Sequence, residues 1–305
     1  MAWRVRIGVN PLSWMNDDLP SLGGETPLEV ALAEGKEIGY EGFELGNKFP
    51  KDGPGLKAKL ADFGLACVSG WYSGELAAGT VEAESTRCHA HMDKLRFNGC
   101  KVVVYGEVAD AVQGQIDTPL SRRPRFANDA AWQAYAERLN VFGAHLKAMY
   151  GITLAYHHHM GAYVESPADI DRLMALTDPA RVSLLFDTGH AYFGGAADVV
   201  ALLGRHVARV AHVHCKDVRP ALIAKARNDG WSFLRGVLAG IFTVPGDGVI
   251  DYDAVLGTLH AAGYQGWLVV EAEQDPAVAP SYTYAKKGYE TLRRIVNRLN
   301  AQASA

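Results

Sequence analysis

Short apolar runs recur along the chain, separated by longer segments with helical periodicity. Eight runs have the length and apolar character of single strands, at 5–10, 42–46, 66–72, 101–106, 152–159, 182–187, 210–214 and 267–273. Between them, apolar residues recur at the helical spacing of three to four positions in the segments 27–38, 56–63, 84–97, 129–149, 167–176, 196–206 and 252–262. The pattern predicts strands that alternate with helices.

This alternation is typical of a parallel sheet with right-handed crossover helices, and eight strands is the number that closes into a (β/α)8 TIM barrel. A doubly wound open sheet is the competing α/β fold. That fold carries a glycine-rich phosphate turn after its first strand, whereas this chain continues with Asn10-Pro11-Leu12. We therefore expect a single TIM-barrel domain over residues 1–305. The segments near 108–128 and 218–247 are too long for simple crossovers, so we expect excursions over the barrel mouth.

The charge balance argues against polyanionic partners. The chain has 30 Lys and Arg against 34 Asp and Glu, a net charge of −4, and no basic run, so nucleic acid and membrane surfaces are not expected partners. It has four cysteines without a CxxC pair, no apolar stretch of about 18 residues, and no signal-peptide pattern at its start. We expect a cytoplasmic protein with a small-molecule substrate, and a homo-oligomer stays open.

Metal-binding side chains stand at the ends of four successive predicted strands. They are His157, Asp187, His214 and Glu271. Active sites of TIM barrels form where the C-terminal ends of the strands meet, so these groups are expected to converge. Carboxylates and imidazoles that are buried together are costly unless they are paired or bound to a cation. The pattern predicts a metal site.

Each of these residues also has a structural explanation. An Asp at a strand end is often a helix N-cap, which would account for Asp187 alone, and His214 could be a hydrogen-bonded core histidine. A coincidence over four successive strands favours the metal site. Within the run from His157 to His159, strand alternation lets at most two side chains enter the site, so we expect His158 to pack behind it.

Residues at the ends of the first three strands are candidates for substrate binding. They are Asn10, Trp14, Glu44 and Trp71. Glu44 could bind a substrate hydroxyl or form a salt bridge at the barrel rim. The two tryptophans could form an apolar wall under a sugar ring, or they could belong to the core.

Six motifs of this chain resemble those of the myo-inosose-2 dehydratase family. They cover residues 10–18, 156–161, 186–192, 212–219, 242–248 and 270–277. That family belongs to the xylose isomerase-like TIM barrels, which also include sugar epimerases and the endonuclease IV group. The resemblance implies a lyase of inositol catabolism that eliminates water from 2-keto-myo-inositol (scyllo-inosose) to give a trihydroxycyclohexane-1,2-dione.

The resemblance also places His157, Asp187, His214 and Glu271 at the positions of metal ligands. His157 stands where the sugar epimerases usually carry Glu. A two-base epimerase needs a second carboxylate, whereas a dehydratase removes one proton and protonates a leaving hydroxide, so this histidine favours elimination. A metal-dependent sugar or cyclitol isomerase or epimerase is the alternative function. A non-catalytic sugar- or metal-binding protein is a third hypothesis.

The expected catalytic roles follow from this hypothesis. Glu271 is expected to be the base, with Glu273 as its substitute, because a ligand carboxylate can use its second oxygen. His159 or His190 is expected to protonate the leaving hydroxide, and Lys216 to stabilise the enolate charge. Nitrogen and oxygen ligands without a thiolate favour Mn²⁺ or Co²⁺, with Zn²⁺ and Mg²⁺ as further candidates.

Overall fold

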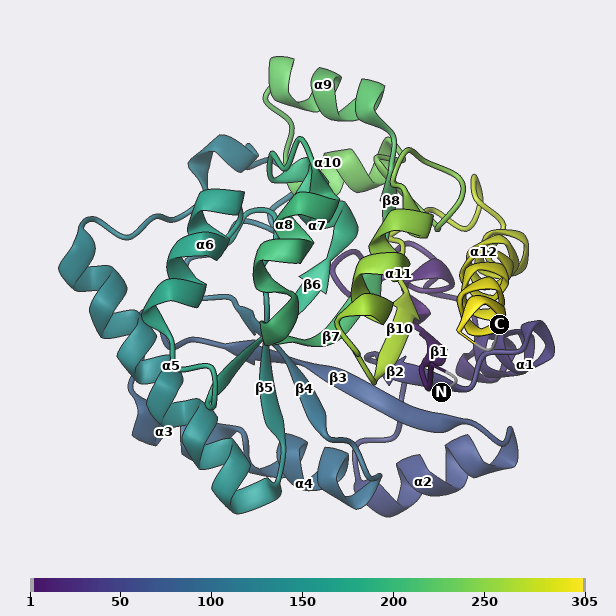
Figure 1. The fold of residues 1–305 in the computed structure, drawn as a ribbon, viewed down its shortest axis with the longest axis horizontal. Helices are drawn as coiled ribbons and strands as arrows, with labels where there is room; N and C mark the ends of the chain where they lie inside the picture. The colour runs from purple at the N-terminus through teal and green to yellow at the C-terminus, as the bar shows by residue number, and fades with distance from the viewer. Residues whose placement is uncertain (1–2, 304–305) are drawn as a thin grey trace.

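The computed structural model describes residues 3–303, which form a closed barrel of eight parallel strands (Figure 1). The strands follow the order β1-β10-β7-β6-β5-β4-β3-β2 around the barrel. Their bounds are β1 Arg6–Val9, β2 Gly42–Leu45, β3 Ala66–Gly74, β4 Val102–Glu107, β5 Thr153–His157, β6 Val182–Asp187, β7 Val210–Cys215 and β10 Trp267–Val270. The predicted TIM barrel is confirmed.

Helices surround the barrel, and most of them follow a strand as its crossover (Figure 1). Their bounds are α1 Leu28–Ile38, α2 Gly53–Asp62, α3 Val81–Arg87, α4 His89–Phe97, α5 Asp129–Tyr150, α6 Pro167–Leu176, α8 Val199–His206, α11 Tyr252–Ala261 and α12 Ser281–Gln302. Gly39 closes α1 with a φ of 113°, which favours glycine because it has no Cβ. α6 starts with a capping box in which Ser166 and Asp169 each bond the other's backbone amide.

Four elements differ from the sequence prediction. The helix expected over 84–97 is divided at Cys88 into α3 and α4. The strands expected over 152–159 and 267–273 end earlier, at His157 and Val270, so the polar residues that follow lie in the loops above the barrel. α12, which the periodicity analysis did not include, packs beside α1 (Figure 1).

The long segment at 218–247 contains secondary structure of its own. β8 (Asp217–Val218) pairs antiparallel with β9 (Phe242–Thr243), and α9 (Pro220–Asn228) and α10 (Phe233–Leu238) lie between them. A second short helix, α7 (Thr188–Phe193), directly follows β6. The other long segment, at 108–128, includes a 3₁₀ helix at Leu120–Arg122, and the amide of Leu120 donates to the carbonyl of Trp231 at 3.1 Å. The two excursions therefore contact each other.

Among residues 3–303, no helix combines the length and hydrophobicity needed to span a bilayer. The cytoplasmic location stays a prediction.

Candidate metal centre and substrate cavity

A cavity of about 410 Å³ lies at the C-terminal end of the barrel strands. Its wall includes residues that follow or end the strands β1, β2, β5, β7 and β10, as well as residues on β3. Among them are Asn10, Glu44, Trp71, His157, His159, His214, Glu271 and Glu273. The strand ends therefore converge as the sequence predicts.

Asp187 ends β6 and also caps the next helix. Its Oδ1 accepts a hydrogen bond from the backbone amide of His190 at 2.8 Å, as an N-cap does. Its Oδ2 is buried without a hydrogen-bond partner among the described residues. That oxygen lies 3.6 Å from both His157 Nε2 and His214 Nδ1 and 3.5 Å from Lys216 Nζ. Asp187 is thus the helix N-cap through Oδ1, and its Oδ2 stays free for the predicted role as a ligand.

The His157 ring is held by its own loop. Its Nδ1 lies 2.7 Å from the carbonyl oxygen of His158, so it donates there and leaves Nε2 as the free acceptor. That nitrogen faces Asp187 and lies 3.2 Å from His214 Nδ1. Burial lowers the pKa of His157 well below its ordinary value, so the ring is neutral, as a metal ligand must be.

The next two histidines diverge. His158 is fully buried behind the site, and its Nε2 accepts the backbone amide of Asp187 at 3.3 Å, which agrees with the predicted packing role. His159 turns back to the cavity, and its Nδ1 donates to the carbonyl of Met160 at 2.8 Å. Burial lowers the pKa of His159 to about 4, so its Nε2 presents a lone pair to the cavity.

His214 connects the front and the back of the site. Its Nδ1 lies 3.0 Å from Glu271 Oε2, and its Nε2 lies 3.0 Å from Glu44 Oε2. Burial alone would lower the pKa of His214, but the carboxylates of Glu271 and Glu44 raise it well above the ordinary value. Without a cation, this imidazole therefore carries a positive charge between two carboxylates.

Lys216 is fully buried at the centre of the acidic groups. Its Nζ lies 2.6 Å from Glu271 Oε1, 2.7 Å from Glu273 Oε2 and 3.1 Å from His190 Nε2. Burial favours the neutral amine, but Asp187, Glu271 and Glu273 outweigh it and raise the pKa of Lys216 above its usual range. Burial raises the pKa of Glu273 to about 7, although Lys216 acts in the opposite direction.

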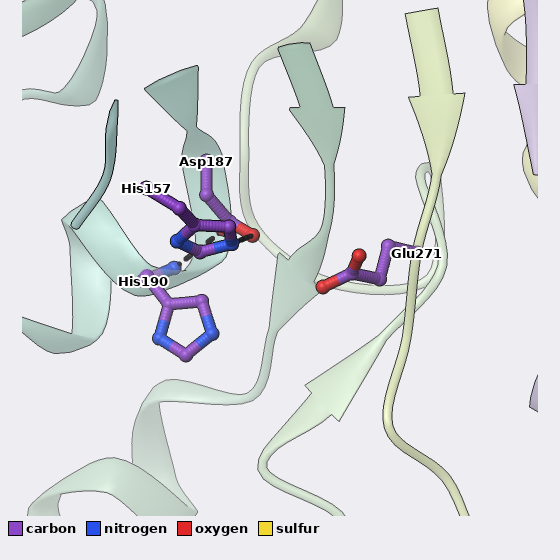
Figure 2. Close-up of side chains that lie close together, drawn as sticks. All are labelled: His157, Asp187, His190 and Glu271. Atoms are coloured by element: carbon purple, nitrogen blue, oxygen red, sulfur yellow. Dashed lines mark hydrogen bonds and ion pairs between the residues drawn. The ribbon is translucent and has the colours of Figure 1, made fainter. Parts of the chain in front are cut away.

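The donor set fits a divalent cation. One ligand atom from each of His157, Asp187, His190 and Glu271 lies within 4.8 Å of all the others. In Figure 2, the imidazole of His157 lies next to the carboxylate of Asp187, the imidazole of His190 lies beside that of His157, and Glu271 reaches toward them from the end of β10. The free Oδ2 of Asp187 and the mixed imidazole and carboxylate donors are what such an ion requires.

His190 therefore joins the predicted ligands as a fifth candidate, although the sequence suggested it as a proton donor. His214 is near the same point through Nδ1, and it also forms a second group of potential ligands with Glu44 and His212. Which four side chains hold an ion stays a prediction.

Three of the expected substrate-binding residues line the cavity. Trp71 packs its ring 5.6 Å from the His157 ring and 5.8 Å from the His159 ring, centroid to centroid. Asn10 donates from Nδ2 to Glu44 at 2.8 Å and to Glu271 at 2.9 Å. Glu44 forms no salt bridge at the rim but is buried beneath the cavity.

The prediction that Trp14 binds substrate is wrong. Trp14 is 1% exposed, and it does not belong to the cavity wall that the described residues form. Its ring packs against Phe43 in the core, and its Nε1 donates to Glu34 at 2.6 Å. After Asn10 the chain forms a 3₁₀ helix at Pro11–Ser13, and Trp14 at its end contacts β2 and α1.

The sequence analysis missed Gln113 and Asp18, which also line the cavity. Gln113 is only 8% exposed, and its Oε1 has no hydrogen-bond partner among the described residues. Asp18 is the last residue of the motif at 10–18, but that motif does not single it out. Gln113 lies in the excursion near 108–128, where no motif falls.

Comparisons with known proteins identify the family of this chain. The model of the xylose isomerase-like TIM barrel family matches residues 32–295. The rhizopine catabolism protein MocC of Rhizobium meliloti is 47% identical over 291 residues, which cover 95% of this chain and 88% of that protein. The inosose dehydratase of Geobacillus thermodenitrificans is 44% identical over 290 residues, or 95% of this chain and 97% of that enzyme.

A solved structure of the IolI protein with a bound zinc atom has a TM-score of 0.66 to this chain at 15% identity, covering 98% of this chain and 99% of that one. That likeness concerns the fold. The matching family model and the relatives above 40% identity confirm the resemblance drawn from the motifs. The chain belongs to the inosose dehydratase family of xylose isomerase-like TIM barrels.

Proposed function

We propose that this protein is a divalent-metal-dependent hydro-lyase that removes water from 2-keto-myo-inositol and yields a trihydroxycyclohexane-1,2-dione. The observation that carries the proposal is the convergence of His157, Asp187, His214 and Glu271 on one buried point beside the cavity. Relatives that match 95% of this chain are named inosose dehydratase, which supports the substrate and the reaction.

The metal site is the first part of the proposal. His157, Asp187, His214 and Glu271 would hold the ion, with His190 as the further candidate, and Mn²⁺ or Co²⁺ as the preferred metals. Such an ion would act as a Lewis acid toward the ketone oxygen. The chain's own residues must then move two protons, one from the α-carbon and one to the leaving hydroxide.

The proton acceptor is the second part. Both oxygens of Glu271 are engaged, Oε1 by Lys216 at 2.6 Å and Oε2 by His214 at 3.0 Å and Asn10 at 2.9 Å. Glu273 also lines the cavity and contacts only Lys216 at hydrogen-bond distance. We therefore assign the base to Glu273, which the sequence placed second, and a ligand role to Glu271.

The proton donor is the third part. Burial keeps His159 and His190 neutral near pH 7, so neither holds a spare proton by itself. Lys216 does, and its Nζ lies 3.1 Å from His190 Nε2, whose ring is 4.0 Å from the ring of His159. Nδ1 of each ring is engaged by the backbone of Met160, so neither ring can pass a proton from one nitrogen to the other. We therefore assign the proton of the leaving hydroxide to Lys216, while Glu273 keeps the proton taken from carbon. One water leaves, and Glu273 then returns one proton to Lys216, which restores the starting protonation state of both residues.

The substrate contacts complete the proposal. Trp71 offers an apolar face next to His157 and His159, against which a cyclitol ring can pack. Asn10 and Glu44 add polar groups to the cavity wall. A polar cavity with one aromatic wall suits a ring with hydroxyl groups on its edge.

The test is direct. Purified protein, loaded separately with Mn²⁺, Co²⁺, Zn²⁺ or Mg²⁺, is incubated with 2-keto-myo-inositol, and the product is analysed by mass spectrometry. We expect a product lighter by one water, and none with Asp187→Ala. A product of unchanged mass would instead identify an isomerase or epimerase. Metal binding without turnover would identify a binding protein.

A further inference from the structure

Glu44 is a buried carboxylate that lies behind the candidate ligands and contacts three side chains. It is 2% exposed, and its oxygens lie 2.6 Å from His212 Nε2, 3.0 and 3.2 Å from His214 Nε2, and 2.8 Å from Asn10 Nδ2. These partners come from β7 and from the end of β1, and β7 is not adjacent to β2. Glu44 therefore reaches across the barrel interior to β7, two strands beyond its neighbour β1.

The amide of Asn10 has one possible orientation. Its Oδ1 accepts the backbone amide of Leu12 at 3.1 Å, so its Nδ2 must face the carboxylates. From Nδ2 it donates to Glu44 at 2.8 Å and to Glu271 at 2.9 Å. The same amide thus links the carboxylate behind the site to a carboxylate within it.

We infer that Glu44 is a positioning residue for the metal centre, an inference that rests on the metal site of the proposed function. By accepting the Nε2 proton of His214, it directs Nδ1 of the same ring toward Asp187 and Glu271. Histidine ligands of metals commonly donate their second N–H to such a carboxylate, which fixes the tautomer and the ring orientation. Through Asn10, Glu44 also helps to fix the carboxylate of Glu271.

A second ion among Glu44, His212 and His214 is the competing explanation, since their potential ligand atoms lie within 4.8 Å of one another. The contacts favour the positioning role. The 2.6 and 3.0 Å separations are those of charge-assisted hydrogen bonds, and three donors already satisfy this carboxylate. We therefore expect one ion for each chain.

The experiment measures Co²⁺ binding without substrate. Co²⁺ is titrated into the metal-free full-length protein, and the dissociation constant and stoichiometry are obtained from visible absorption and from competition with a chelator. We expect one ion for each chain, and an affinity about 10- to 100-fold weaker in Glu44→Gln. The matched control is Glu107→Gln. Glu107 is also a buried glutamate at a strand end, but its partners are Tyr105, Tyr135 and two backbone amides.

The variant Glu44→Asp distinguishes a loss of metal affinity from a folding defect. The shorter carboxylate keeps its charge, so circular dichroism should show a native fold and Co²⁺ affinity should lie between those of the wild type and Glu44→Gln. If Glu44→Gln does not fold, the Co²⁺ affinity of Glu44→Asp is compared with that of the wild type alone. An affinity within threefold of wild type in both variants overturns the inference, and so does a second ion bound at Glu44 or a wild type that binds no Co²⁺. Co²⁺ binding that depends on Glu44 without dehydration of the substrate would refute the proposed reaction alone.

Discussion

Two carboxylates two positions apart in the chain have different surroundings. Glu271 is bonded by His214, Lys216 and Asn10, and Glu273 only by Lys216. Charged partners hold the pKa of Glu271 below its ordinary value despite burial, whereas burial raises the pKa of Glu273 to about 7. At the residue scale, this difference in neighbours and in pKa supports the proposed roles, a metal ligand for Glu271 and a proton acceptor for Glu273.

The first prediction concerns Glu273→Gln, which keeps the shape of the side chain but removes its capacity to take a proton. We expect kcat for dehydration to fall by about 10²- to 10⁴-fold, with little change in KM. Steady-state kinetics of the metal-loaded enzyme measure this, and Glu107→Gln serves as the control. A loss of less than about tenfold would return the base role to Glu271.

A second prediction concerns Lys216→Met. In the metal-free protein, this change leaves Asp187, Glu271 and Glu273 buried without the ammonium that contacts all three. We expect a loss of about 3–5 kcal/mol in the free energy of unfolding, measured with urea, because an uncompensated buried charge is costly. Lys225→Met is the control.

Lys225 pairs with Asp229 on the surface, where both side chains are more than 40% exposed. Its loss should change stability by no more than about 1 kcal/mol, since exposed pairs contribute little. Equal effects of the two lysine substitutions would contradict the charge-balancing role of Lys216.

At the scale of elements, strand ends could be predicted but contacts across the barrel could not. Asp187, His214 and Glu271 each close an apolar run, and the rule that TIM barrels place their sites there brings the residues together. Glu44 closes β2 in the same way, yet its partner on β7 is 168 residues distant in sequence. No local pattern encodes that pairing, because it depends on how a closed sheet directs its inward side chains.

The pairing of β8 with β9 could not be predicted from the sequence either. Each strand has two residues, which is too short to show an alternating pattern. The segment after β9 is held by one side chain. Asp217 accepts backbone amides of Val218, Gly246, Gly248, Val249 and Ile250 through its two oxygens. A lone Asp next to a Lys gives no sign of this role in the sequence.

The third prediction concerns the substitution Asp217→Ala. The substitution leaves several partly buried amides without an acceptor, so we expect a loss of about 1–3 kcal/mol or more in stability. Hydrogen exchange should increase most over residues 244–250, while the barrel strands stay protected. Uniform exchange over the whole chain would show that the residue acts on global stability and does not organise this loop.

The fourth prediction concerns pH and Glu107, which joins β4 to α5 through Tyr135. Burial raises the pKa of Glu107 to about 7 from an ordinary value near 4.5. Between these values the folded protein holds a proton that the unfolded chain has released, so folding stability decreases as the pH rises from about 4.5 to 7. The decrease attributable to Glu107 is about 3 kcal/mol.

Glu107→Gln cannot titrate, so the difference in unfolding free energy between wild type and variant should change by this amount across that pH range. Urea unfolding at pH 5, 6, 7 and 8 measures it. A difference that is independent of pH would show that Glu107 is ionised in the folded protein throughout.

At the scale of the whole molecule, the barrel buries acidic and basic groups together. Burial of any one of these charged groups alone would be energetically unfavourable. Asp187 and Lys216 are both 0% exposed, and Glu271 is 4% exposed. Lys216 and His214 offset the carboxylates in the metal-free state, and an ion would take over part of that role. The fold could be predicted from periodicity alone, but this charge balance could not, because it depends on distances between side chains.

The last prediction is that a bound metal stabilises the entire barrel. An ion that binds only the folded chain adds about 2.7 kcal/mol at a free concentration of 100 times its dissociation constant. For a protein of this size, that corresponds to a rise in Tm of several degrees. Differential scanning calorimetry should show the rise on addition of Mn²⁺ or Co²⁺ and its reversal by EDTA. Asp187→Ala should unfold at a temperature independent of either addition, because the ion has lost the ligand whose Oδ2 is free. An equal rise in wild type and variant would place the ion elsewhere on the molecule.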